Sequence, residues 1–282
     1  MKKTITIIEA NRPWWNIEFK EVFKYKSLFY FLIRRDFVTS YKQTVLGPVW
    51  VVVQALMGSA VFTIIFGKIA KLSTDGHPAF LFYLAGNLSW QFFGGVFGIG
   101  SNALQSNHNL FSKVYFPRII PPIAQSFSII INLIIHLLLF GISMYIYKYS
   151  FGDSTSGPNM WIIILPLIAL QTLALGLGLG FILSSISIKY RDIGRLAGLM
   201  TQFIMYASPV IYPLSLIPDK YKFLSQINPL TFIVESYRFV LLGSAQGFNI
   251  VHAISSIGLT LVFLIIGIIL YNKTQRSYVD YI

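Results

Sequence analysis

Residues 43–67 read QTVLGPVWVVVQALMGSAVFTIIFG, a run of 25 residues without a charged side chain. Five more uncharged runs follow in the chain, at 76–112, 119–147, 154–188, 196–218 and 239–272. Each run exceeds the roughly 20 apolar residues that a helix needs to cross about 30 Å of hydrocarbon. The sequence therefore predicts an all-α integral membrane protein with six transmembrane helices.

Composition and charge support this class. Of the 282 residues, 11% are charged and 55% are hydrophobic, whereas soluble domains average about 25% charged residues. With the N-terminus inside and the six spans in order, 16 of the 22 Lys and Arg fall on the inner side. This is the positive-inside pattern, so we expect both termini in the cytoplasm. The net charge of +12 then reports orientation, and no nucleic acid partner is expected.

The chain divides into three parts. Residues 1–46 form a cytoplasmic N-terminal segment in which an amphipathic interface helix is expected, although a plain membrane-surface anchor has the same pattern. Residues 273–282 form a cytoplasmic tail. In the fourth span, Gly176, Gly178 and Gly180 predict a close approach between helices. The transmembrane part is 47–272, with spans expected at about 47–69, 80–103, 121–147, 160–186, 196–212 and 251–271.

The region 213–244 does not fit a full span. It contains Pro213, Pro218 and Pro229 among apolar residues, with 12 uncharged positions between Lys222 and Glu235. That stretch is too short to cross a bilayer and too apolar for a solvated loop. We expect short re-entrant helices in the outer leaflet, packed against protein; the alternative is a folded external loop lying on the membrane.

The chemistry of an enzyme or an ion-driven carrier is absent from the spans. Such proteins place titratable groups inside the membrane, and the candidates here are His136 and His252, each alone. Ser-nucleophile, zinc-protease and Walker motifs are missing from the sequence, and there are no cysteines. We therefore expect no catalytic residue, no metal and no cofactor bound by this chain. Energy for active transport would have to come from a partner.

Aromatic rings and neutral amides are what the first two spans do contain. Rings of this kind stack on sugars while amides bind hydroxyl groups, so a carbohydrate passage is one interpretation. The other is that Trp and Tyr form interfacial belts and that the Phe residues face lipid.

Two cytoplasmic stretches could dock a partner. One is the loop 105–122, with a short amphipathic segment rich in aromatic residues, and the other is Arg34–Asp36 leading into Tyr41 and Lys42. Either could instead be a positive-inside anchor.

Five stretches resemble a known class in sequence and in order: LIRRDFVTSYKQTVLGPVWVVVQALMGSAVFTIIFG (32–67), NHNLFSKVYFPR (107–118), KYRDIG (189–194), SPVIYP (208–213) and NPLTFIVESYRFVLLG (228–243). They are similar to the permease subunits of bacterial ABC exporters for surface polysaccharides. The O-antigen lipopolysaccharide type is the nearest, and teichoic acid and capsule permeases are the alternative. A secondary carrier or a membrane-embedded transferase is less consistent with the missing titratable groups.

The resemblance implies a bacterial inner-membrane channel made of two copies of this chain above two copies of a separate ATP-binding subunit, which would hold ATP and Mg. The substrate would be a lipid-linked polysaccharide, moved outward from the cytoplasm, and membrane lipid would surround the channel.

The resemblance also implies residue roles. Contact with the ATPase would involve Asn107, Asn109, Leu110, Phe111, Lys113, Tyr115, Phe116, Arg118, Lys189, Arg191 and Asp192. The interface helix would end with Arg34, Arg35, Asp36, Tyr41 and Lys42. Candidates for the glycan path are the aromatic residues Trp50, Phe62, Trp90, Phe203 and Tyr206. An external gate would contain Pro209, Tyr212, Pro213, Pro229, Glu235 and Arg238; Glu235 and Arg238, three residues apart, could pair on one helical face.

Overall fold

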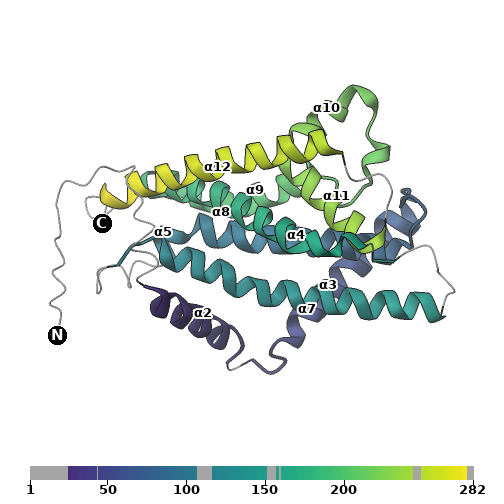
Figure 1. Ribbon diagram of the computed structural model, residues 1–282, viewed down its shortest axis with the longest axis horizontal. Coiled ribbons are helices and arrows are strands. Elements are labelled where there is room, and N and C mark those ends of the chain that lie inside the picture. Colours follow the sequence, from purple (N-terminus) through teal and green to yellow (C-terminus); the bar gives the residue numbers. More distant parts are fainter. Residues whose placement is uncertain are drawn as a thin grey trace.

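The computed structural model describes residues 25–42, 44–106, 116–150, 157–158, 160–243 and 249–277. The described chain is a bundle of long helices that run roughly along one axis (Figure 1). Its elements are α2 (Lys26–Tyr41), α3 (Val49–Phe62), η1 (Thr63–Ile69), α4 (Ala79–Ser101), α5 (Ala103–Ser106), α7 (Ile120–Ser150), η2 (Met160–Ile164), α8 (Leu165–Lys189), α9 (Arg191–Tyr206), η3 (Leu214–Leu216), α10 (Asp219–Ile227), α11 (Pro229–Leu242) and α12 (Ile250–Ser277).

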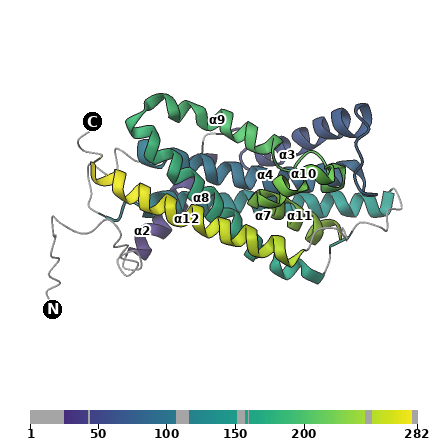
Figure 2. The same ribbon diagram turned by 90° about the horizontal axis from the view of Figure 1, so that it is seen from above.

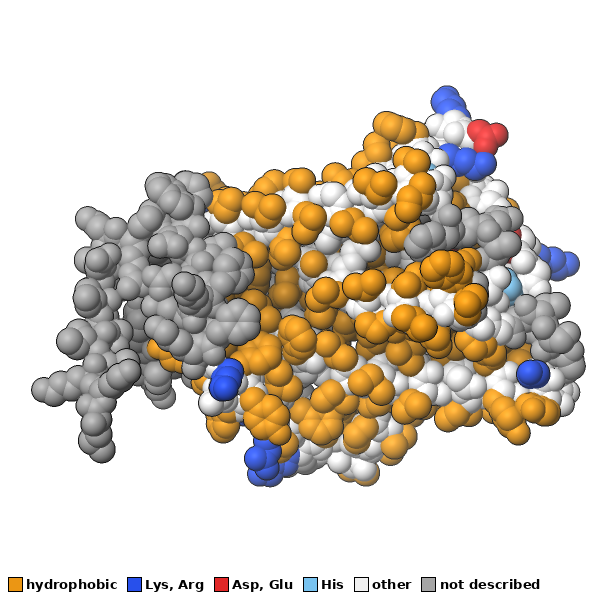
Figure 3. Space-filling model, viewed as in Figure 1, with side chains coloured by type: hydrophobic (Ala, Val, Ile, Leu, Met, Phe, Trp, Pro, Cys, Tyr) orange, Lys and Arg blue, Asp and Glu red, His pale blue; other side chains and the backbone are white. Residues whose placement is uncertain are grey.

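Four helices in the described residues are long and apolar enough to cross a membrane: Val49–Ile69, Ile120–Ser150, Met160–Lys189 and Ile250–Gln275. Hydrophobic side chains cover the middle of the face in Figure 3, while Lys and Arg lie near its two ends. The predicted helical membrane-protein class is thus confirmed for the described residues. The count of six spans stays a prediction, because α9 has 16 residues, which extend about 24 Å, and α4 is not among the four.

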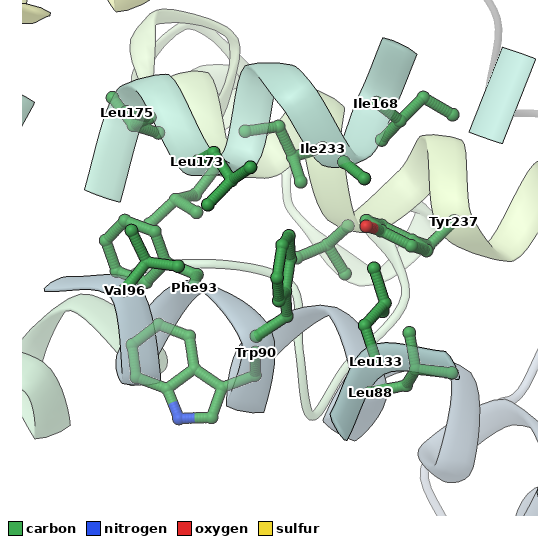
Figure 4. Packing of buried hydrophobic residues seen from close by; sticks show 14 of the residues in the cluster. Leu88, Trp90, Phe93, Val96, Leu133, Ile168, Leu173, Leu175, Ile233 and Tyr237 are labelled. Atoms are coloured by element: carbon green, nitrogen blue, oxygen red, sulfur yellow. The ribbon is translucent and has the colours of Figure 1, made fainter. Parts of the chain in front are cut away.

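Helix α4 lies at the centre of the bundle. It has 23 residues and carries no charge, and it packs against α3, α7, α8 and α11. Figure 4 shows Phe93 and Val96 of α4 on the side of the helix that faces Leu173 and Leu175 of α8. Lipid therefore has little access to α4, whose apolar surface is buried in protein.

Glycines set the closest helix contacts. A Cβ on Gly180 of α8 would lie 2.7 Å from the Cα of Gly100 in α4, and one on Gly267 of α12 would lie 2.3 Å from the carbonyl oxygen of Gly178. These distances leave no room for a side chain. The predicted close approach at Gly178 and Gly180 is confirmed.

The bundle has two distinct ends (Figures 1 and 2). We call one the α5 end; it contains α5, the start of α7, the turn between α8 and α9, and the last turn of α12. The other is the α10 end, which contains α10 and the turn between η1 and α4. There, the hydroxyl of Ser215 in η3, just before α10, donates to Asp75 Oδ1 at 2.7 Å, which links η3 to the turn before α4.

Helix α2 lies against α7. Its buried residue Leu32 packs on Ile120 and Ala124 of α7. The chain then turns through Gly47, whose φ of +50° suits a residue without a Cβ, and enters α3. The C-terminal part of the expected interface helix falls within α2, and residues 1–24 lie outside the described residues. A location of α2 in the membrane interface stays a prediction.

Candidate functional site

The most elaborate polar arrangement in the described chain surrounds Arg238 of α11. Its Nη1 donates to the carbonyl oxygen of Pro209 at 2.6 Å and to Glu235 Oε1 at 2.8 Å. Its Nη2 donates to the carbonyl oxygen of Val210 at 2.6 Å, and Nη1 also lies 3.4 Å from that of Tyr212. Arg238 is 1% exposed. One guanidinium thus holds the segment after α9 against α11.

Helix α4 closes the other side of this cluster. The ring of Phe82 lies under the guanidinium, 3.8 Å from its carbon to the ring centroid, a cation–π contact. A Cβ on Gly86 would lie 2.7 Å from the carbonyl oxygen of Val210 and 2.9 Å from Nη2 of Arg238. The glycine therefore gives the guanidinium and the 207–212 backbone room to approach α4.

The sequence placed Pro209, Tyr212, Glu235 and Arg238 in one group, and the structure brings these four together. Pro213 is buried and begins the turn into η3. Pro229 starts α11 after Asn228, whose side chain accepts a hydrogen bond from the Leu230 amide. The carbonyl oxygen of Pro229 accepts from the hydroxyl of Ser256 in α12 at 2.9 Å.

This arrangement is a clamp and not a reaction centre. A buried charge is costly unless it is paired and hydrogen-bonded, and here the guanidinium has a carboxylate, two short carbonyl contacts and a ring. Nothing in the cluster offers a nucleophile next to a base. Among the described residues there is also no group of three His, Asp or Glu that could hold a metal ion.

The described members of the predicted docking set fall at the α5 end. Residues Asn107, Asn109, Leu110, Phe111, Lys113 and Tyr115 lie outside the described residues. Phe116 is buried. Arg118 donates through Nη1 to the carbonyl oxygen of Gln275 and accepts from the Tyr271 hydroxyl at 3.0 Å, so it ties the start of α7 to α12.

The second predicted contact is the turn between α8 and α9. Lys189 ends α8 with its Nζ 5.4 Å from the ring centroid of Tyr190. Arg191 begins α9, and Asp192 is exposed in its first turn. The turn thus lies at the same end of the bundle as Phe116 and Arg118.

The residues expected at the end of the interface helix differ in their exposure. Arg34 and Lys42 are exposed, while Arg35 donates to Asp36 Oδ1 from Nε at 2.9 Å and from Nη2 at 2.7 Å. The hydroxyl of Tyr41 donates to Asn132 Oδ1 of α7 at 2.5 Å. Helix α2 is therefore attached to α7 through its last turn.

The aromatic residues predicted to line the glycan path differ in their exposure: some lie on the surface and others in the core. Trp50 of α3 and Phe203 and Tyr206 of α9 are 52%, 72% and 60% exposed. Phe62 makes edge contacts with the rings of Phe66 and Tyr83. Trp90 is 9% exposed and packs against Phe93 in the core, as Figure 4 shows.

Sequence reasoning missed part of the polar contacts around Arg238 and part of those between α2 and α7. The carbonyl contacts of Arg238 leave no trace in a sequence, since any residue supplies a carbonyl group. Gln125 and Asn132 in the third uncharged run gave a readable signal, as amides within an apolar stretch, and they lie beside Asp36 and Tyr41. The contact of Phe82 with Arg238 could not be predicted either, because the first two spans contain many aromatic residues and the sequence does not single out this one.

Comparison with known proteins gives a consistent picture. The family described as "ABC-2 type transporter" matches residues 27–242. Among curated proteins, the "O-antigen export system permease protein RfbA" of Myxococcus xanthus is 25% identical over 223 residues, covering 78% of this chain and 82% of the relative. A protein of the same name from Klebsiella pneumoniae is 22% identical over 249 residues, covering 88% of this chain and 92% of the relative.

Proposed function

Because the chain belongs to the ABC-2 type transporter family, we propose that it is the membrane-spanning subunit of an ATP-driven exporter for a lipid-linked polysaccharide of the O-antigen type. The observation that carries the proposal is the similarity, over 78% and 88% of the chain, to permeases named for O-antigen export. The four long apolar helices agree with it. The glycan would move from the cytoplasm across the inner membrane.

ATP and Mg act in a separate partner subunit. The α5 end is the cytoplasmic end in this proposal, with both termini on that side. Ser106, just before the predicted coupling loop, and Arg118, at the end of that loop, lie there together with the turn at 189–192. Arg118 supports this role, since its bonds to α12 join the end of that loop to a long helix. A push on the loop would then reach the bundle directly.

Two copies of the chain form the conduit, each with six spans including α4 and α9. The aromatic side chains exposed on α3 and α9, among them Trp50, Phe203 and Tyr206, support this arrangement. Rings on the surface of one copy can face a channel between two copies. There they would contact the apolar faces of sugars, while the buried Trp90 would support the channel wall from within.

The α10 end is the external gate in this proposal. Helices α10 and α11 would enter the outer leaflet without crossing it, and α11 is buried almost throughout, which supports a position inside the assembly. The clamp at Arg238 would keep the segment after α9 and α11 together while the gate opens and closes.

The first test is purification of the chain from its own cells together with its natural partners. An ATP-binding subunit should co-purify, and deletion of this chain should remove the glycan from the cell surface while glycan accumulates inside. Absence of a co-purifying ATPase, together with an unchanged cell surface after deletion, would refute the exporter role.

The coupling loop is tested by Tyr115→Ala in the reconstituted complex. We expect loss of the ATP hydrolysis that the permease stimulates, together with loss of export. Tyr149→Ala is the matched control, because Tyr149 is 70% exposed at the far end of α7. Equal hydrolysis and export in both variants would exclude a coupling role for Tyr115.

A further inference from the structure

An open cleft of about 600 Å³ lies between α2, α4 and α7 at the α5 end of the bundle. Its volume is within the range of about 300–1,000 Å³ that is typical of ligand sites. On the α4 side, a Cβ at Gly98 would meet nothing within 4 Å, so the helix leaves open space there. The lining residues are Asp36, Phe37, Thr39, Ser40, Tyr41, Gly95, Gly98, Ile99, Asn102, Ser106, Gln125, Ser128, Ile129 and Asn132.

The lining is largely apolar in area but contains several polar groups and a single charged one. It has a carboxylate, a phenol, four aliphatic hydroxyls and three amides, and among the described residues that form it there is no Lys or Arg. Arg35, the ion-pair partner of Asp36, is not among the lining residues, so a phosphate or diphosphate would find no Lys or Arg in the described lining. Phe37 and Tyr41 add an aromatic wall, with ring centroids 5.0 Å apart in an edge arrangement.

Several groups in the cleft are already fixed by the protein. Tyr41 donates to Asn132 at 2.5 Å, and the amide of Asn102 donates to the carbonyl oxygen of Gly98 at 3.0 Å. Burial raises the pKa of the Tyr41 phenol, so it stays protonated and keeps donating at neutral pH. The amide oxygen that accepts this bond is thereby held in one orientation.

Asp36 is the group with capacity left for a ligand. Its Oδ1 accepts both hydrogen bonds from Arg35, whereas its Oδ2 is buried with no hydrogen-bond partner among the described residues. A buried acceptor without a partner costs free energy that a ligand donor can recover. Hydroxyl groups of a neutral polyol are such donors, and they do not repel a carboxylate.

We propose that this cleft binds one uncharged sugar residue of the glycan at the cytoplasmic entrance of the conduit. The inference rests on the proposed export function and adds a defined contact point for the glycan. Asp36 accepts from sugar hydroxyls, the amides of Asn102, Gln125 and Asn132 surround the ring, and Phe37 and Tyr41 pack on its apolar face.

The test is photo-crosslinking in glycan-producing cells that carry the tagged full-length chain and its natural partners. A benzophenone amino acid replaces Ile129, which lines the cleft, or Ile134, which lies on the same helix and is 51% exposed. After irradiation, position 129 should give a high-mass band that stains for carbohydrate, at least about tenfold stronger than from position 134.

Other occupants give different products. A membrane lipid would add the mass of one lipid without carbohydrate stain, and a second copy would give a band at twice the 31.9 kDa of the chain. Either product as the main adduct at position 129, or equal carbohydrate adducts at both positions, would overturn the proposal. If the parent chain still exports glycan in such a case, the exporter role stands and the cleft assignment alone fails.

A substitution adds a second readout. Asp36→Asn should lower the carbohydrate adduct at position 129 about tenfold, because hydrogen bonds to a charged acceptor are the stronger ones. Thr44→Ala, an exposed change just beyond α2, should leave it unchanged. An unchanged adduct in Asp36→Asn would remove Asp36 from the site. If Asp36→Asn fails to accumulate in the membrane, the comparison of positions 129 and 134 in the parent chain still decides.

Discussion

Replacement of Arg238 by Met should destabilise the folded chain more than any surface change. The variant keeps a long side chain of similar length but leaves Glu235 Oε1 and the carbonyl oxygens of Pro209 and Val210 without the donors that now lie 2.6–2.8 Å away. Removing one partner of a buried ion pair costs about 3–5 kcal/mol. Loss of the contact with Phe82 adds to this.

The measurement is the melting temperature of the purified protein in detergent. A fluorescent fusion of the chain is heated, and size-exclusion chromatography measures how much of it stays folded at each temperature. On the scale of domains of similar size, the melting temperature should fall by roughly 6 to 20 °C. The control is Arg195→Met in α9, since Arg195 is exposed. The double variant Arg238→Met with Glu235→Leu should recover part of the loss, because it removes the uncompensated carboxylate. A melting temperature equal to that of the control would refute the clamp.

Three further predictions test other parts of the structure. Gly267→Ala should reduce the amount of folded chain, because its Cβ would lie 2.3 Å from a backbone oxygen of α8. Gly258→Ala in the same helix is the control and should be neutral, because its Cβ would meet nothing within 4 Å. The yield of each variant from membranes is the measurement. Trp90→Ala should cost about 3–5 kcal/mol of stability, seen as a lower melting temperature, whereas Trp50→Ala should keep the melting temperature and lower glycan export. The pKa of the Asp219 carboxyl is lowered by a hydrogen bond from Lys222 and, to a smaller extent, by the charge of that lysine. The pair therefore stabilises the fold at pH values above the ordinary pKa of Asp, and this stabilisation is lost as the pH falls through the lowered pKa. Asp219→Asn should therefore differ only slightly from the parent at neutral pH, because the pair is exposed, and the melting temperatures should converge in acid.

The fold class was readable from the sequence because hydrocarbon imposes a simple rule: a spanning helix must be uncharged over its length. Charge spacing alone therefore predicted the helical membrane protein. It did not separate spans that face lipid from helices buried in protein, since both are uncharged. Helix α4 shows this ambiguity most clearly, because its burial comes from α8, α7 and α11 around it.

The candidate site was predictable to a smaller extent. Glu235 and Arg238 were paired by their spacing on a helix, and the structure confirms that contact at 2.8 Å. The partners of Arg238 in the segment 209–212 are backbone carbonyls, which every residue has, so their position depends on the tertiary fold. The cleft beside α2 was missed for a related reason: Asp36 and Asn132 are 96 residues apart and meet only after α2 folds back on α7.

The cleft beside α2 and the cluster around Arg238 lie in different parts of the helix bundle. Helix α9 runs from the α5 end, where the cleft lies, toward the cluster around Arg238. It begins at Arg191, next to the turn at the α5 end, and finishes at Tyr206, directly before the carbonyl groups that Arg238 holds. Most side chains of α9 are exposed, so fewer buried contacts restrain α9 than restrain α4 or α11. Packed secondary elements can carry coupling between distant sites, and α9 with the clamped segment forms a continuous connection between the two ends. In the proposed exporter, a displacement imposed at the α5 end would reach the α10 end through α9, and Arg238 would make α11 follow it.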